Sequence, residues 1–296
     1  MRASAPNSKS PTPFLKWAGG KRALVAQILE HVPKDIDTYY EPFLGAGSLF
    51  FSLPSSLPKV VSDFNVELIS VYETIRDELD GVLAELRKFR NTKEDYLAVR
   101  AWDRSPGFAR RSAQSRAARF IFLNKCGFNG LYRVNSLGQY NVPYGNPKNV
   151  DFVAEQNLRA VSEFLNANKT RGGKASKISS GDYREILKKA TGVGSLVYFD
   201  PPYHPTSQTS NFTSYSSQGF GEVDQIQLRD EAVRLTKEKV RVLISNSDTD
   251  FIRNLYKDRI FRINELSVRR AIAAKSSSRG VITEVLIDNF KAIGRG

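Results

Sequence analysis

The segment Asp200-Pro201-Pro202-Tyr203 joins an acid, two prolines and an aromatic ring directly after the apolar stretch 195–199. Two consecutive prolines force an extended turn and provide carbonyl oxygens while removing two backbone N–H donors. A carboxylate beside such a carbonyl can accept both hydrogens of an exocyclic amine, and the tyrosine can stack on the ring that bears it. A simple strand-terminating loop is the alternative, but folding alone gives little reason for this combination. The segment therefore predicts a site that holds an aromatic amine.

A second candidate site is the turn EPFLGAGS at 41–48, which follows the apolar residues Tyr39 and Tyr40. Its glycines permit a tight turn and close approach of a ligand to the backbone. The spacing matches neither the dinucleotide fingerprint nor the phosphate loop, so an ordinary turn is the alternative. Asp63 closes the next predicted strand. At that position an acid commonly accepts hydrogen bonds from ribose hydroxyls, which favours a nucleoside ligand.

Two further segments carry residues suited to nucleic acid. Trp17 lies among Lys16, two glycines and Lys21, a set that suits a flat charged ligand or a phosphate. Taken alone, a helix entry with Trp17 in the core explains that segment better. The loop at 126–145 interleaves aromatic and amide side chains around Arg133. Arginine suits guanine in the major groove, and apolar side chains can fill a gap in a base stack; an ordinary hairpin is the alternative.

The charge of the chain favours a polyanionic partner. The formal net charge is +13. Between residues 87 and 133, twelve Lys and Arg face three acids, a net charge of +9 in under a sixth of the chain. Such localised charge is typical of a surface that docks on phosphates, although a basic surface that binds nothing is the alternative.

Composition excludes several other classes of protein. No apolar run approaches the roughly 18 residues that a membrane helix needs, so we expect no membrane segment. Residues 1–12 are rich in Ser and Pro, which predicts a disordered tail. Cys126 has no second cysteine with which to pair, which favours a reducing, cytoplasmic setting. With only His31 and His204 beside it, the usual zinc site cannot form, and we expect chemistry without a metal.

Strand-like and helix-like patterns alternate at both ends of the chain, which predicts an α/β sheet covered by helices. A strand, a glycine turn and the start of a helix are expected in turn over 38–51. Further strands are expected near 59–63, 195–199, 241–245 and 282–288, helices near 24–30 and 65–79, and a polar surface loop at 166–180. The basic stretch at 84–125 has a helical pattern. The simplest division is a catalytic domain at 13–72 and 166–296 with an inserted recognition domain at 73–165. Residues 206–220 and 269–279 are expected to form a lid and a phosphate-contacting segment, with flexible surface loops as the alternative.

Four motifs then occur in one order: FLKWAGGK, EPFLGAGS, FNGLYRVN with NVPYG, and DPPY. Together they resemble the Dam-type DNA adenine-N6 methyltransferases that act on GATC, including those of restriction–modification systems. The resemblance runs from about Phe14 to Tyr256 and resumes near the end of the chain. It implies a Rossmann-like, seven-stranded methyltransferase sheet that binds S-adenosylmethionine, with an inserted, mostly helical DNA-recognition domain. It also implies double-stranded DNA as the partner, a monomer, and a possible cognate restriction endonuclease that acts on the same site.

The resemblance also assigns roles to individual residues, position by position. Lys16 and Arg133 match residues that read guanines, and Phe128 and Leu131 match groups that insert into the base stack. Several relatives place Tyr at position 128, so the phenyl ring here keeps the stacking surface and lacks the hydroxyl. The residues implied for S-adenosylmethionine are Trp17, Lys21, Glu41, Phe43, Gly45, Asp63, Asp182, Tyr183 and Asp200. Those implied for the target adenine are Asp200, Pro201, Pro202 and Tyr203, and those for DNA are Lys16, Phe128, Asn129, Leu131, Arg133 and Pro143.

Together, these features predict an enzyme that flips an adenine out of duplex DNA and methylates its amine without a covalent intermediate. Methylation of cytosine N4, of RNA or of a protein amide on the same fold is the nearest alternative. A catalytically silent DNA-binding regulator is the alternative from another class, and the intact DPPY and glycine motifs argue against it.

Overall fold

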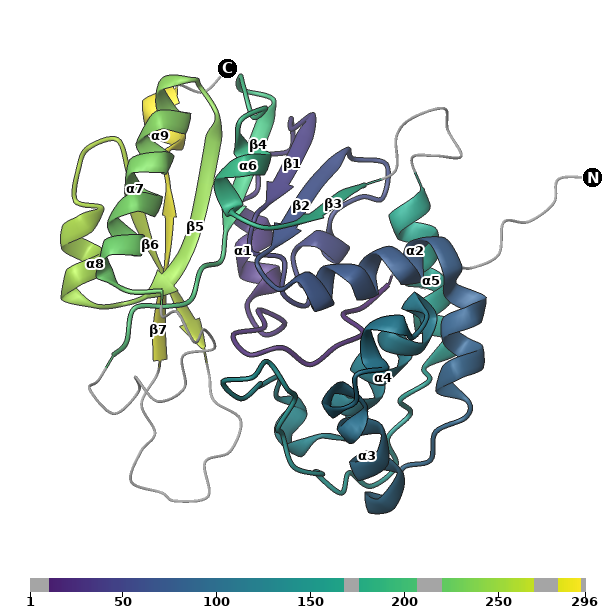
Figure 1. Cartoon of the computed structure of the whole chain (residues 1–296). Coiled ribbons are helices and arrows are strands. Elements are labelled where there is room, and N and C mark those ends of the chain that lie inside the picture. Colours follow the sequence, from purple (N-terminus) through teal and green to yellow (C-terminus); the bar gives the residue numbers. More distant parts are fainter. Residues whose placement is uncertain (1–10, 168–175, 207–219, 269–281, 294–296) are drawn as a thin grey trace, which may run out of the picture. The chain divides into compact units, whose positions relative to one another are not determined.

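The computed structural model describes residues 11–167, 176–206, 220–268 and 282–293 (Figure 1). The tail expected at 1–12 therefore lies outside the described residues except for its last two positions. The expected lid and phosphate-contacting segment lie almost wholly outside them. The helices are α1 Val25–His31, α2 Val66–Leu86, α3 Lys93–Arg100, α4 Ala113–Cys126, α5 Glu155–Asn166, α6 Tyr183–Leu187, α7 Glu222–Lys237, α8 Asp250–Leu255 and α9 Phe290–Ile293. The strands are β1 Thr38–Glu41, β2 Lys59–Asp63, β3 Lys177–Ser180, β4 Ser195–Phe199, β5 Arg241–Ser247, β6 Arg262–Val268 and β7 Ile282–Asp288, and four short 3-10 turns lie at Phe50–Ser52, Ala101–Arg104, Phe108–Arg110 and Phe128–Gly130.

The strands form one seven-stranded sheet in the order β3-β2-β1-β4-β5-β7-β6. β1 runs parallel to β2 and β4, and β4 runs parallel to β5. β7 is antiparallel to both β5 and β6. The central strands β4 and β5 are buried along their whole length, as expected of parallel strands that are covered on both faces. The predicted Rossmann-like α/β class is confirmed.

The strand order indicates that a ligand would bind at the carboxyl ends of the central strands. From β1 the chain first adds β2 on one side and later adds β4 on the other side. Open α/β sheets bind ligands beyond the carboxyl ends of the strands where the order reverses in this way. Glu41 ends β1, Asp63 ends β2, and Asp200 follows β4. Three acids therefore stand at the carboxyl ends of parallel strands.

The chain divides into two compact units by its internal contacts. The first, here called the helical unit, comprises residues 1–20, 45–56 and 65–180. The second, here called the sheet unit, comprises residues 21–44, 57–64 and 181–296. These limits describe packing, and the functional boundaries predicted at 73 and 165 stay a prediction.

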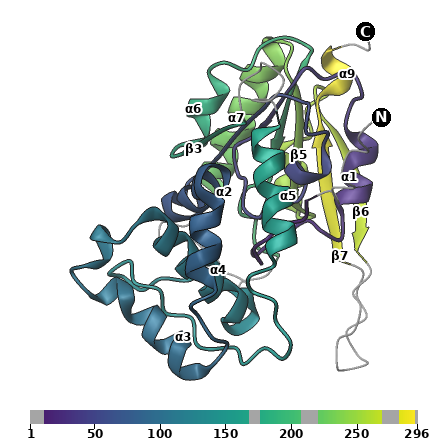
Figure 2. The ribbon, with the colours of Figure 1, turned by 90° about the vertical axis from the view of Figure 1, so that its right-hand side faces the viewer.

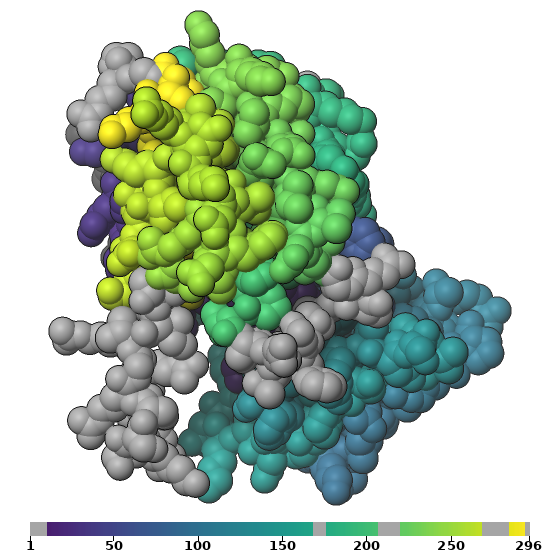
Figure 3. All heavy atoms as spheres, turned by 90° about the vertical axis from the view of Figure 1, so that its left-hand side faces the viewer, coloured from purple at the N-terminus to yellow at the C-terminus, as the bar shows by residue number. Residues whose placement is uncertain are grey.

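Apolar packing within the sheet unit joins three helices to one face of the sheet. Leu187 of α6, Leu228 and Leu235 of α7, and Ile252 of α8 are fully buried against the strands. α1 lies on the other face of the sheet (Figure 2). The solvent side of α7 and α8 forms a continuous surface of this unit (Figure 3). Helices on both faces keep the central strands out of water, which explains their continuous apolar sequences.

In the helical unit α2 packs along α4 and α5. Asn65 caps α2 by accepting a hydrogen bond from the backbone N–H of Leu68. Part of the basic charge counted in the sequence is structural: Arg119 of α4 is buried and pairs with Asp103 at 2.6 Å. Arg104 also bonds Asp103, at 2.7 Å. Most of the other Lys and Arg side chains between residues 87 and 133 are exposed.

Two expectations about secondary structure were wrong or incomplete. Residues 166–180 were predicted as a surface loop, but residues 177–180 form the edge strand β3. Only Ile178 of this strand is buried, so its sequence lacks the apolar alternation that signals a strand. An edge strand is held by backbone hydrogen bonds, which any side chain allows. The sequence also gave no signal for β6, whose sequence RINELSV is largely polar and which pairs with β7.

No helix among the described residues combines the length and the apolar character that crossing a membrane requires.

Candidate functional site

The DPPY segment carries a buried ion pair. The Nζ atom of Lys21 lies 2.8 Å from Oδ1 of Asp200, and the side chains of the two residues are 6% and 19% exposed. The same Nζ lies 4.4 Å from the centre of the Tyr203 ring, within range of a cation–π interaction. Lys21 was expected to bind a cofactor, and the structure places its ammonium between the acid and the aromatic ring of DPPY.

Burial and charge act on Asp200 in opposite directions. Burial raises the pKa of its carboxyl above the usual range, because the charged form loses its water. The neighbouring Lys21 ammonium partly opposes this and favours the carboxylate. The second carboxylate nearby, Glu284, raises the pKa further. Lys21 is therefore the group that favours the charged acceptor in a place that disfavours charge.

Glu284 of β7 also fixes Tyr203. The Tyr203 hydroxyl donates a hydrogen bond of 2.7 Å to Oε2 of Glu284. Burial raises the pKa of this hydroxyl well above its usual value, so it remains a donor. Lys21 thus contacts the ring of Tyr203, and Glu284 binds its hydroxyl. The sequence analysis did not identify Glu284, because an acid within the strand-like run ITEVLID does not indicate which distant residue its side chain will contact.

A cluster of aromatic rings lies near the carboxyl ends of β1 and β4. The Phe43 ring centre is 5.3 Å from that of Tyr183, 5.8 Å from Phe220 and 6.4 Å from Phe199. Flat ring surfaces of this kind suit a purine base. The acids that end the neighbouring strands differ in exposure: Glu41 is 3% exposed and accepts from the Tyr39 hydroxyl at 2.8 Å, whereas Asp63 is half-buried.

One buried atom in this cluster favours a polar ligand. The Tyr183 hydroxyl is buried and has no hydrogen-bond partner among the described residues. Burial raises the pKa of this hydroxyl to about 12. An unpaired buried hydroxyl costs about 1–3 kcal/mol, and a ligand acceptor would remove that cost. With rings for a base and acids for hydroxyls, these residues fit the nucleoside part of S-adenosylmethionine.

Three further residues expected at the cofactor are Asp182, which is exposed, and Trp17 and Gly45, which belong to the helical unit. The Asp182 carboxylate is 44% exposed and binds the Arg184 guanidinium at 2.6 Å, which lowers its pKa. Trp17 and Gly45 belong to the helical unit, where they contact each other: a Cβ built on Gly45 would lie 2.9 Å from Cδ1 of Trp17. Gly45 has a φ of +49°, so both its conformation and this contact require glycine. Trp17 also stacks on Tyr132 at 5.5 Å.

The residues expected to contact DNA gather within the helical unit. Asn124, which is 1% exposed, accepts from the Lys16 backbone N–H at 2.8 Å and donates to the carbonyls of Lys16 and Gly130. The Lys16 side chain passes so close to Gly130 that a Cβ there would lie 2.3 Å from Lys16 Cδ. Asn124 thus brings Lys16 beside a loop far along the chain. Sequence reasoning missed it, because a lone asparagine in a helix predicts no tertiary partner.

The loop at 126–145 exposes several of its side chains to solvent. Phe128 is 50% exposed, and its backbone N–H donates to the Pro143 carbonyl at 2.9 Å. Asn129 is exposed with a φ of 53°, a left-handed conformation that asparagine tolerates. Arg133 is exposed, and its Nε donates to Oδ1 of Asn141 at 2.7 Å. Leu131 is half-buried. Exposed aromatic and guanidinium groups on one short loop suit insertion and base reading.

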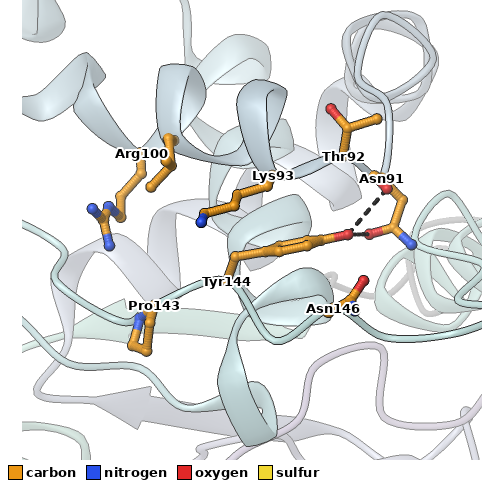
Figure 4. A pocket seen from close by; sticks show the side chains of 8 residues that line it. Asn91, Thr92, Lys93, Arg100, Pro143, Tyr144 and Asn146 are labelled. Atoms are coloured by element: carbon orange, nitrogen blue, oxygen red, sulfur yellow. Dashed lines mark hydrogen bonds between the residues drawn. The ribbon is translucent and has the colours of Figure 1, made fainter.

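A cavity of about 760 Å³ lies next to this loop (Figure 4). Its wall includes two cations, two amides and two hydroxyls. The Tyr144 hydroxyl crosses it to bind the backbone carbonyl of Asn91 at 3.1 Å. The lining residues are Asn91, Thr92, Lys93, Leu97, Arg100, Pro143, Tyr144 and Asn146.

Comparison with known proteins now assigns the family. The family model of the D12 class N6 adenine-specific DNA methyltransferases matches residues 17–272. This chain belongs to that family. The match spans both the DPPY segment and the exposed loop, so the predicted enzyme class, an adenine-specific DNA methyltransferase, is confirmed.

Several relatives of this D12-class methyltransferase match over nearly its whole length. It is 43% identical to the type II methyltransferase M1.LlaDCHI of Lactococcus lactis subsp. cremoris, over 94% of this chain and 95% of the relative. It is 39% identical to the type II methyltransferase M.MjaIII of Methanocaldococcus jannaschii, over 94% and 99%. It is 36% identical to a DNA adenine methylase of Vibrio cholerae, over 94% and 96%.

Among solved structures, the rRNA methyltransferase aviRa from Streptomyces viridochromogenes matches with a TM-score of 0.36 and 15% identity. The match covers 98% of this chain and 89% of that chain.

Proposed function

We propose that this D12-class methyltransferase transfers a methyl group from S-adenosylmethionine to the N6 amine of an adenine flipped out of duplex DNA, within GATC. The observation that carries the proposal is the buried Asp200–Lys21 pair, which sits where the parallel strands end. The enzyme acts as a cytoplasmic monomer and without a metal. Two relatives named type II methyltransferases support a partner restriction endonuclease for the same site.

The acceptor site follows from the chemistry of DPPY. The Asp200 carboxylate accepts one amine hydrogen, and the Pro201 carbonyl accepts the other. The Pro202 carbonyl is already engaged by the Gln225 side chain at 2.9 Å, which makes Pro201 the carbonyl for the substrate. Drawing both hydrogens toward acceptors moves the nitrogen toward tetrahedral geometry and frees its lone pair. Tyr203, fixed by Glu284 and Lys21, supplies the ring on which the adenine stacks.

The donor site uses the neighbouring strand ends. When bound, S-adenosylmethionine supplies a methyl group activated by a positively charged sulfur. Phe43 and Tyr183 hold its adenine ring, with Asp182 beside it, and Asp63 accepts its ribose hydroxyls. Glu41, Lys21 and Asp200 face its polar end. Trp17 and Gly45, the other two residues expected at the cofactor, belong to the helical unit.

The exposed loop recognises DNA. Lys16 and Arg133 read the guanines of GATC, and Phe128 and Leu131 fill the gap that the flipped adenine leaves. Asn129 and Pro143 support these contacts from the neighbouring backbone. Filling the gap offsets part of the few kcal/mol that unstacking costs.

The decisive test is transfer of label from S-adenosylmethionine to GATC-containing DNA by the wild-type enzyme and by Asp200→Ala. We expect Asp200→Ala to lower the transfer rate by at least about 10²–10³-fold, because a positioned acceptor is lost from a water-poor site. The exposed Asp230 on α7 offers the matched control Asp230→Ala, which should keep full activity.

Mass analysis of the digested nucleosides identifies the product. N6-methyladenine is expected. N4-methylcytosine would show instead that the enzyme methylates the exocyclic amine of cytosine. Near wild-type transfer by Asp200→Ala would refute the proposed mechanism.

A further inference from the structure

Two buried side-chain amides lie behind the DPPY segment, and neither belongs to a motif. Gln225 of α7 is 1% exposed, and Asn246 of β5 is fully buried. Gln225 Nε2 donates to the Pro202 carbonyl at 2.9 Å, and Asn246 Nδ2 donates to Gln225 Oε1 at 3.0 Å. The backbone N–H of His204 donates to Asn246 Oδ1 at 3.1 Å. The two amides therefore link the backbone on either side of Tyr203.

The direction of every bond in this chain is fixed. A carbonyl can only accept, so Gln225 must present its nitrogen to Pro202. A backbone N–H can only donate, so Asn246 must present its oxygen to His204. The remaining oxygen of Gln225 and nitrogen of Asn246 then face each other with matching roles. An amide at each position, oriented in this way, satisfies all three bonds.

Further bonds hold the far side of the segment. Ser247 donates from its backbone N–H to Asn246 Oδ1 at 2.9 Å and from its hydroxyl to the His204 carbonyl at 2.5 Å. The His204 ring stacks on Phe251 with centres 4.6 Å apart. His204 is thus fixed by Ser247, Asn246 and Phe251. Gln225 and Asn246 then link its backbone N–H to the carbonyl of Pro202 on the other side of Tyr203.

We propose that Gln225 and Asn246 are positioning residues for methyl transfer, which hold the Asp200–Pro201 acceptor pair at the target amine by fixing the backbone around Tyr203. The inference rests on the proposed function. The amide pair also occupies the Pro202 carbonyl, so the substrate amine meets one carbonyl of defined position instead of two. Small displacements of a reacting group change reaction rates strongly. Loss of the hydrogen bonds made by Gln225 and Asn246 should therefore affect the chemical step more than the binding of either substrate.

The test compares Gln225→Met, which keeps the length of the side chain and loses both polar atoms, with the wild-type enzyme. The exposed Gln227 on the same helix provides the control Gln227→Met. The measurements are the single-turnover rate of label transfer from S-adenosylmethionine to unmethylated genomic DNA, the Kd for S-adenosylmethionine and the Kd for that DNA. We expect Gln225→Met to lower the rate on the order of 10- to 100-fold while both Kd values stay within about twofold. The control should match the wild type.

Gln225→Glu adds a readout that a purely structural role would not give. The introduced carboxylate would face the Pro202 carbonyl with an acceptor, whereas its protonated form can donate as the glutamine does. Its rate relative to the wild type should therefore rise as the pH falls. This variant also carries the test if Gln225→Met does not fold.

The outcomes separate the two proposals. A single-turnover rate of Gln225→Met within twofold of the wild type would overturn the positioning role, as would equal weakening of the rate and of both binding constants. For Gln225→Glu, the positioning role would also be overturned if the rate were reduced but the ratio of the variant rate to the wild-type rate did not change with pH. If Asp200→Ala, measured alongside, still transfers label at the wild-type rate, the proposed function itself fails.

Discussion

The DPPY segment of the sheet unit and the loop at 127–145 of the helical unit are both irregular, yet their side chains are held very differently. Asp200 and Lys21 form a buried pair, and the Tyr203 hydroxyl is bonded to Glu284. In the loop, Phe128 is 50% exposed and Leu137 is 77% exposed. Its backbone is fixed, as by the bond from Phe128 to Pro143, but the side chains at its surface point to water.

This contrast agrees with the roles that we propose for the two regions. Groups that stabilise a transition state act best when they are already oriented in a site that excludes water. Groups that recognise DNA must stay exposed until the duplex supplies their partners. Substitutions in the DPPY segment should therefore change the rate of the chemical step. Substitutions in the loop should change affinity or sequence preference.

The largest effect should come from breaking the buried pair with Lys21→Met. Burial already raises the pKa of Asp200, and loss of the ammonium raises it further. Because the charged form is the acceptor, activity is lost as the pH falls through this higher pKa. At saturating donor we expect kcat to fall roughly 10- to 100-fold near neutral pH, and the acid limb of its pH profile to move to higher pH. The control is Arg22→Met, at the exposed neighbouring residue. If the acid limb of the pH profile of Lys21→Met did not move, Lys21 would not be the group that keeps Asp200 charged.

A smaller, sequence-dependent effect is expected for Arg133→Ala. Loss of a bidentate contact to guanine costs about 1–3 kcal/mol at one base pair. Methylation rates on single-base variants of GATC should show relaxed discrimination at that one position. A uniform loss across all variants would indicate a phosphate contact instead.

Phe128→Ala should slow methylation of a fully paired duplex by about tenfold, because nothing then fills the vacated stack. The same variant should lose much less on a duplex with an abasic site opposite the target adenine, where flipping is easier. Leu137→Ala, exposed in the same loop, is the matched control. Equal losses on both duplexes would show that Phe128 does not act on flipping.

The smallest effect is expected at the cavity beside the loop, with Lys93→Gln. If Lys93 contacts one phosphate, the slope of log affinity against log salt concentration should become shallower by about one. Discrimination between sequences should stay unchanged. Lys257→Gln, an exposed lysine of the sheet unit, should leave the slope unaltered.

Much of the fold could be predicted because its signals are local. The apolar run before Asp200 predicts β4, and KVVSD predicts β2, with the same bounds that the structure shows. The edge strand β3 could not be predicted in the same way, since its pairing depends on a neighbouring strand and not on its own side chains. The same holds for β6, whose largely polar sequence carries no strand pattern.

The sequence alone determined the family and the DPPY segment, because these depend on residue types and on order along the chain. Only the tertiary structure decided which groups surround them. It placed Lys21 against Asp200, Glu284 against Tyr203, and Gln225 and Asn246 behind the segment. These partners lie on separate helices and strands, and folding brings them together through burial of apolar surface, which leaves no local pattern at the polar residues themselves.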